Sequence, residues 1–175
     1  MMKYALYDYI PQRRLRKAPF ETRDISRRIL LFKNGNKTAT NWAVGIFRTA
    51  LSHMDLHDTI IVCVPASCQR TYVRRFRKFS KALCKKCGAI DGFPFVSVKG
   101  KRDKAHIAKG DTSSRLSNVI IDKDVFMGRK VVIIDDICTT CTTANLFISM
   151  MEAAGAEVRM ALFLGKTRNY WHQQS

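Results

Sequence analysis

The chain is short of acidic residues, of long apolar segments and of internal repeats. No apolar run approaches the roughly 18 residues that a membrane-spanning helix needs, and residues 1–17 lack the apolar core of a signal peptide. We therefore expect a cytoplasmic protein without membrane contact. No repeat or low-complexity tract divides the 175 residues, and a hydrophobic content of 46% predicts one sizeable core.

The shortage of acidic residues leaves the chain strongly basic. Its 14 Asp and Glu stand against 31 Lys and Arg, which gives a formal net charge of +17. Such a charge attracts polyanions, and two kinds of partner are open: a phosphate-rich small molecule, or nucleic acid along a basic surface. The basic residues are spread over residues 13–17, 70–86 and 99–109, so composition does not choose between them.

The six cysteines are expected to be reduced thiols, because the sequence shows no secretion signal. Two C-x-x-C pairs, Cys84 with Cys87 and Cys138 with Cys141, keep a shared zinc site open as an alternative. Against zinc, the 50 residues between the pairs far exceed the usual zinc-ribbon spacing.

The apolar patterning predicts an α/β fold. Residues 1–24 read as an irregular arm broken by Pro11 and Pro19. Helices are predicted over residues 25–33, 38–52, 70–87 and 144–151, and strands over 59–64, 93–98, 119–121, 131–134 and 158–164. This order indicates a mainly parallel central sheet flanked by helices. We expect one domain over residues 1–175, with an N-terminal arm and helical hood segment over 1–56 and a core over 57–175.

Residues 131–143, VVIIDDICTTCTT, are the most informative segment. Four β-branched residues predict a buried strand, and the loop that follows opens a helix at the carboxyl end of the sheet. Helix N-termini bind anions, and four threonine hydroxyls can add donors around a phosphate. The acidic residues Asp135 and Asp136 suit a ligand that also carries vicinal hydroxyls or Mg²⁺, as a pentose phosphate does.

This segment resembles the phosphoribosyl pyrophosphate (PRPP) signature of type I phosphoribosyltransferases. The resemblance implies a type I phosphoribosyltransferase-like fold with a small N-terminal hood. It also implies an enzyme that binds PRPP with Mg²⁺ and transfers the phosphoribosyl group to a nitrogen nucleophile such as a nucleobase. At position 141 this chain has Cys where the family usually has Gly, the residue that lets the backbone approach phosphate closely.

The same resemblance implies roles for particular residues. Asp135 and Asp136 would be the catalytic pair that contacts the ribose hydroxyls, directly or through Mg²⁺. The 5-phosphate would be held by Thr139, Thr140, Cys141, Thr142 and Thr143. The pyrophosphate would be contacted by Pro65, Ala66, Ser67, Arg74 and Arg75. A flexible loop would contribute Lys101, Arg102, Lys104 and His106.

Further segments, including Val64-Pro65, Arg74-Arg75-Phe76 and residues 153–156, look like the ComF family of phosphoribosyltransferase-like proteins, which is associated with competence for DNA uptake. Many members carry an N-terminal zinc-binding cysteine cluster, which the first 60 residues here lack. The alternative reading is therefore a non-catalytic nucleotide-binding or single-stranded DNA-binding protein. The acceptor substrate is not readable from the sequence, and a homodimer is left open.

Overall fold

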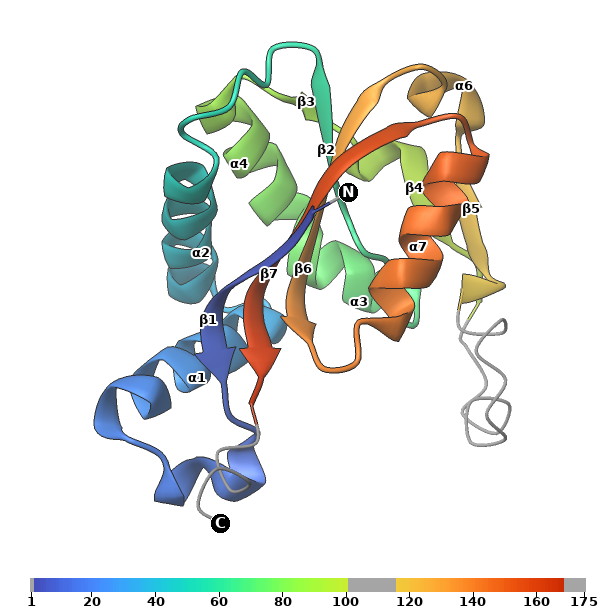
Figure 1. Ribbon diagram of the computed structural model, residues 1–175. Coiled ribbons are helices and arrows are strands. Elements are labelled where there is room, and N and C mark those ends of the chain that lie inside the picture. The colour runs from blue at the N-terminus through green and yellow to red at the C-terminus, as the bar shows by residue number, and fades with distance from the viewer. Residues whose placement is uncertain (1, 101–115, 169–175) are drawn as a thin grey trace.

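Five parallel strands form the centre of the fold, and the inner ones are the most apolar segments of the chain (Figure 1). The structure, a computed structural model, describes residues 2–100 and 116–168. The strand order is β1-β7-β6-β2-β3, and each neighbouring pair is parallel. The strands are β1 (Met2–Tyr9), β2 (Thr59–Cys63), β3 (Ile90–Asp91), β6 (Lys130–Cys138) and β7 (Glu157–Thr167).

Helices cover both faces of this sheet, as parallel sheets require. In Figure 1, α1 (Phe20–Lys33), α2 (Lys37–Ala50) and α4 (Lys78–Cys87) lie on one side, and α7 (Thr142–Ala153) lies on the other. Shorter helical segments are η1 (Gln12–Lys17), α3 (Gln69–Tyr72), η2 (Val73–Arg77), η3 (Phe93–Phe95) and α6 (Lys123–Phe126). The predicted fold class, a mainly parallel sheet flanked by helices, is confirmed.

The prediction that residues 1–24 are irregular is wrong. β1 pairs with β7 along almost its whole length, from Met2 beside Met160 to Tyr9 beside Thr167. Helix α1 also begins earlier than predicted, directly after Pro19, where a proline is well tolerated because a helix start needs no amide donor there. The N-terminal segment thus supplies an edge strand of the central sheet.

The predicted strand over residues 93–98 is only half right. Residues Phe93–Phe95 form the helical turn η3, and only β4 (Val96–Val98) is extended. β4 pairs with β5 (Val119–Ile121) in a separate two-stranded antiparallel sheet. Glycine is needed at position 92, where the chain passes close to β2, because a Cβ there would lie 2.7 Å from Ile60 Cγ2. The turn that follows is closed by the Phe95 amide, which donates to the carbonyl of Gly92 (3.2 Å).

A buried aromatic cluster fixes the helices on the α1 side. The ring of Phe79 lies 5.0 Å from that of Phe32 in α1 and 5.4 Å from that of Phe47 in α2. Tyr72 and Phe76 continue the cluster and are also fully buried. Such large apolar side chains contribute most of the burial energy of a core, about 3–5 kcal/mol each when truncated to Ala.

The segment α3-η2-α4 is one continuous helical rod with a π-helical turn, η2, in its middle. Such turns shift the register of a helix locally and are frequent near functional sites. Within η2, Phe76 is buried and Arg75 is largely buried, whereas Arg74 and Arg77 are exposed. The turn therefore directs one arginine inward beneath the sheet edge. Among the helices of the described ranges, none has both the length and the apolar character for a membrane crossing.

Candidate functional site

A cavity of about 300 Å³ lies at the carboxyl edge of the sheet, where β6 ends and α7 begins. This is the edge at which ligands bind to open parallel sheets, and it is the lower edge of the sheet in Figure 1. The lining comes from the loop after β2, the end of β6, the β6–α7 loop, the first turn of α7, one residue of β7 and one helical arginine: Val64, Pro65, Ser67, Arg75, Asp135, Asp136, Ile137, Cys138, Thr139, Thr140, Cys141, Thr142, Thr143, Ala144 and Phe163.

The acidic pair belongs to a strand and not to a loop. β6 was predicted to end at Ile134, but it continues to Cys138, which is paired with Lys166 of β7. Successive side chains of a strand leave opposite faces of a sheet, so the two carboxylates diverge and have different partners. Asp135 accepts a hydrogen bond from the Asp136 amide (2.8 Å), and Asp136 accepts one from the Ile137 amide (2.6 Å).

Asp136 is also engaged in a buried ion pair. Its Oδ2 lies 2.7 Å from Nη1 of Arg75, and the two side chains are only 5% and 13% exposed. Arg75 Nε in addition donates to the backbone carbonyl of Lys33 at the end of α1 (3.1 Å). Arg75 thus connects the acidic strand to two helices, and its charge compensates a carboxylate that would otherwise be buried alone.

Asp135 is the less constrained member of the pair. It is half-buried, and its pKa is raised well above the usual range of an aspartate, first by burial and second by the neighbouring Asp136 carboxylate. Asp135 forms no ion pair with the Lys and Arg residues that the structure describes, and a carboxylate in such a place is stabilised when a ligand brings a positive charge or a hydroxyl donor. Asp135 is therefore the acidic side chain most ready to accept a ligand.

The loop between β6 and α7 has the form of an anion cradle. Thr142 and Thr143 lie in the first turn of α7, where amide groups point outward without helical acceptors. The hydroxyls of Thr140 and Thr142 lie 2.9 Å apart, and Thr139 pairs with Thr167 at the end of β7 (3.0 Å). Several hydroxyls and amides thus face one small volume, which suits a tetrahedral anion.

The expectation that all cysteines are reduced is wrong for the β6–α7 loop. Cys138 and Cys141 form a disulfide, whereas the other four cysteines, all of them in the described part of the chain, are thiols outside any disulfide: Cys63, Cys68, Cys84 and Cys87. The spacing is responsible, because the turn brings the two Cα atoms to 4.9 Å, within the range of a disulfide. The zinc alternative does not fit this arrangement, since zinc needs thiolate ligands and both sulfurs of the second C-x-x-C pair are already bonded.

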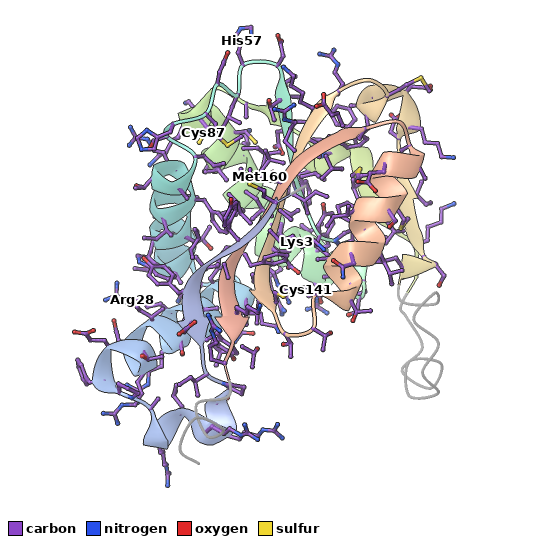
Figure 2. All side chains as sticks on the ribbon, viewed as in Figure 1. Lys3, Arg28, His57, Cys87, Cys141 and Met160 are labelled. Carbon is purple, nitrogen blue, oxygen red and sulfur yellow. A yellow bond between two sulfur atoms is a disulfide. The ribbon has the colours of Figure 1, made fainter. Side chains whose placement is uncertain are left out.

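Cys141 has an unusual backbone conformation. Its φ is 56°, the only positive value of a non-glycine residue among those the structure describes. It occupies the position before α7, and its carbonyl accepts the first helical hydrogen bond, from the Asn145 amide (2.8 Å). Glycine adopts this conformation without steric cost because it has no Cβ, whereas a cysteine in the same conformation carries a steric penalty. Figure 2 shows Cys141 at the turn between β6 and α7.

The structure brings most of the predicted site residues to one place. Both aspartates, residues 139–143, Pro65, Ser67 and Arg75 line the cavity. Ala66 lies between two lining residues, and Arg74 is directed away to a separate groove beside Gly35. Lys101, Arg102, Lys104 and His106 lie outside the described residues.

Sequence reasoning missed several residues of this region. Tyr9, at the carboxyl end of β1, has a raised pKa because of burial and, secondarily, the charge of Asp136. Ile137, Cys138 and Phe163 supply apolar wall to the cavity. The signal for Tyr9 was present in the tyrosine-rich pattern of residues 2–9, which is typical of a strand.

Comparisons with known proteins give one family match and two similar structures. A family model described as phosphoribosyl transferase domain matches residues 30–174. Two adenine phosphoribosyltransferase structures are similar, each with a TM-score of 0.47. The protein from Rhodothermus marinus DSM 4252 is 18% identical, with 75% of this chain and 69% of that chain covered. For the protein from Thermoanaerobacter pseudethanolicus ATCC 33223, the identity is 21% and the coverages are 74% and 68%. No curated protein sequence matches.

Proposed function

The chain belongs to the phosphoribosyl transferase domain family, and we propose that it binds PRPP with Mg²⁺ and transfers the phosphoribosyl group to a nitrogen nucleophile. One observation carries this proposal: a single cavity of about 300 Å³ unites an acidic pair, four threonines and the start of a helix. That combination of acceptors and donors matches a sugar phosphate, because the sugar offers hydroxyls and the phosphate offers anionic oxygens.

The 5-phosphate is assigned to the β6–α7 loop. Amide groups at the start of α7 and the hydroxyls of Thr139, Thr140, Thr142 and Thr143 surround the site, and the positive end of the helix dipole favours a dianion there. Cys141 lines the same cavity, and its role here is assigned to its backbone. The pyrophosphate is assigned to the opposite wall, where the chain turns at Pro65 and Ser67 after β2.

The two aspartates receive different roles. Asp135, half-buried and in no ion pair within residues 2–100 and 116–168, accepts hydrogen bonds from the ribose hydroxyls. Asp136 acts through Arg75, since the ion pair with Arg75 already occupies it. Arg75 also lines the cavity, and a hydrogen-bond donor that an ion pair holds in place stabilises developing negative charge at low reorganisation cost.

The donor set of the cavity fits Mg²⁺ only as a companion of the ligand. Among residues 2–100 and 116–168, no three His, Cys, Asp or Glu side chains come together as a metal cage. Mg²⁺ usually binds through one or two carboxylates, water and the phosphates of a substrate. Asp135 would supply the protein ligand, and the ion when bound would neutralise charge on the departing pyrophosphate.

Isothermal titration with PRPP in the presence of Mg²⁺ tests this assignment. Wild-type protein should bind PRPP, and Asp135→Asn should lose most of the affinity because the ribose loses a charged acceptor. The control is Asp124→Asn, an exposed aspartate of α6 outside the cavity, which should bind as the wild type does. Pyrophosphate release with a panel of purine and pyrimidine bases then identifies the acceptor. Failure of the wild type to bind PRPP would refute the proposal.

A second candidate function concerns a basic groove, which we define as the cavity lined by Gly35, Val73, Arg74, Arg77, Lys78 and Lys81. Its volume is about 520 Å³, its four charged residues are exposed cations, and the rod α3-η2-α4 contains no Asp or Glu. Single-stranded nucleic acid binds to such grooves through its phosphates. This feature, together with the resemblance to ComF-like proteins, supports a DNA-binding role as the alternative.

Fluorescence anisotropy with a labelled single-stranded oligonucleotide distinguishes the two functions. Four phosphate contacts predict a slope of about −3 for log affinity against log salt. The double variant Arg77→Glu/Lys81→Glu should abolish the binding, whereas Asp135→Asn should leave it unchanged. Affinity that does not respond to salt or to the double variant would refute the DNA-binding candidate.

A further inference from the structure

The disulfide between Cys138 and Cys141 is poorly placed to act as a structural staple. It closes a segment of only four residues, and the stabilisation that a disulfide gives through chain entropy grows with the length of the closed loop. The sheet and helix that it joins are already adjacent in sequence and packed against each other. A role other than stability is therefore indicated for a bond that lies in the wall of the cavity.

The bond holds the one strained residue of the loop. Cys141 keeps a left-handed conformation with φ 56° at the residue that positions the amides of the first turn of α7. The left-handed conformation costs a non-glycine residue about 1–2 kcal/mol, which corresponds to about fivefold to thirtyfold in population. The bond to Cys138 opposes this relaxation, because Cys138 is fixed as the last residue of β6 and is 2% exposed.

We propose that Cys138 and Cys141 form a reversible redox site that sets the affinity of the loop for phosphate, high when the disulfide is closed and low when it is open. The inference rests on the proposed function, because the phosphate is that of the bound PRPP. In the open form Cys141 relaxes towards negative φ, and the peptide planes on either side of it rotate. The amides that surround the anion then no longer converge.

The reaction partner is an external dithiol. A thiolate of the dithiol attacks Sγ of Cys141, which is more accessible than that of Cys138. This step forms a mixed disulfide and releases the Cys138 thiolate, which takes up a proton. The second thiol of the partner then attacks the mixed disulfide, leaves as the oxidised partner and releases Cys141 as a thiol. Two electrons and two protons pass to the protein, and an oxidised dithiol reverses the step.

The test combines thiol mapping with calorimetry. Wild-type protein is equilibrated with oxidised or reduced dithiothreitol, the state of each cysteine is read by alkylation and peptide mass, and each form is titrated with PRPP and Mg²⁺. We expect the reduced form to bind PRPP about fivefold to thirtyfold more weakly. Cys141→Gly, which fits positive φ without a disulfide, should show the same PRPP affinity in both redox buffers.

Cys87→Ser is the matched control, because Cys87 is a half-buried free thiol near the end of α4, far from Cys141 in Figure 2. Its PRPP affinity should respond to redox buffer as the wild type does. Equal affinity of both wild-type forms, with mapping that shows the bond opened, overturns the redox site alone. The redox site is likewise overturned, and the proposed function is not, if the reduced form binds PRPP more tightly or if the oxidised buffer does not close the bond. Absence of binding in both forms and in Cys141→Gly overturns the proposed function as well.

Discussion

The ion pair between Arg75 and Asp136 should be the most sensitive polar interaction of the fold. At 2.7 Å and with an effective dielectric constant of about 20, Coulomb's law gives an attraction of about 6 kcal/mol. Desolvation of two groups that are 13% and 5% exposed offsets part of it. Removal of one partner leaves the other charge buried and uncompensated, which typically costs about 3–5 kcal/mol. Arg75→Met should therefore lower the free energy of unfolding by about 3 kcal/mol.

Urea denaturation followed by circular dichroism measures this loss. With an m-value of about 2 kcal/mol/M, a loss of about 3 kcal/mol moves the midpoint down by about 1.5 M. Asp136→Leu, similar in shape but uncharged, should cost a comparable amount. In the double variant Arg75→Met/Asp136→Leu neither charge remains, so the loss should be at least about 2 kcal/mol smaller than the sum of the single losses.

An exposed ion pair provides the comparison. Arg28 and Asp24 lie 2.9 Å apart on α1, but their side chains are 51% and 49% exposed. Pairs of this kind contribute about 0.3–0.5 kcal/mol, so Arg28→Met should barely move the midpoint. If Arg75→Met costs no more than Arg28→Met, or if the two losses at Arg75 and Asp136 simply add, the argument from burial is wrong.

Four single substitutions test other parts of the fold. Burial and Asp136 raise the folded-state pKa of Asp135, so its contribution to stability is complete below about pH 4 and is lost as the pH rises through the folded pKa. Asp135→Asn should therefore raise the melting temperature at pH 7. In calorimetric scans the melting temperature of this variant should also change less with pH than that of the wild type. Gly45→Ala, exposed within α2 with open space at the Cβ position, should stabilise by about 0.5–1 kcal/mol, whereas Gly92→Ala should destabilise by about 1–3 kcal/mol against Ile60 in urea titrations. Phe79→Ala should cost about 3–5 kcal/mol of unfolding free energy, and a loss below 1 kcal/mol would contradict the role of the aromatic cluster.

Local patterns in the sequence predict the centre of the fold well. The apolar run that begins at Val131 forms a buried strand, as its composition predicts. The threonine-rich turn marks the start of α7. The inward stripe of the basic helix, with Phe76, Phe79 and Leu83, is buried as its spacing predicts. These features depend on contacts within a short segment or on the general rule that apolar faces turn inward.

Features that depend on distant partners could not be predicted in this way. β1 exists because β7, at the other end of the sequence, offers it an edge. Arg75 is largely buried and Arg74 is exposed because the π-helical turn η2 shifts the register of the helix there. Composition does not reveal such a turn. The difference between Asp135 and Asp136 likewise needs the position of Arg75, and the disulfide needs the loop geometry that brings Cys138 to Cys141.

The pairing of β1 with β7 has a consequence for synthesis on the ribosome. β1 leaves the exit tunnel before every other strand of the sheet, yet its hydrogen-bonding partner β7 is translated after all of them. Until then its tyrosine-rich edge is available to chaperones and to neighbouring nascent chains. Completion of the sheet must therefore be a late event, and slow because it closes a very long loop. Deletion of residues 2–9 should leave β7 as a bare edge and promote aggregation of the newly made protein.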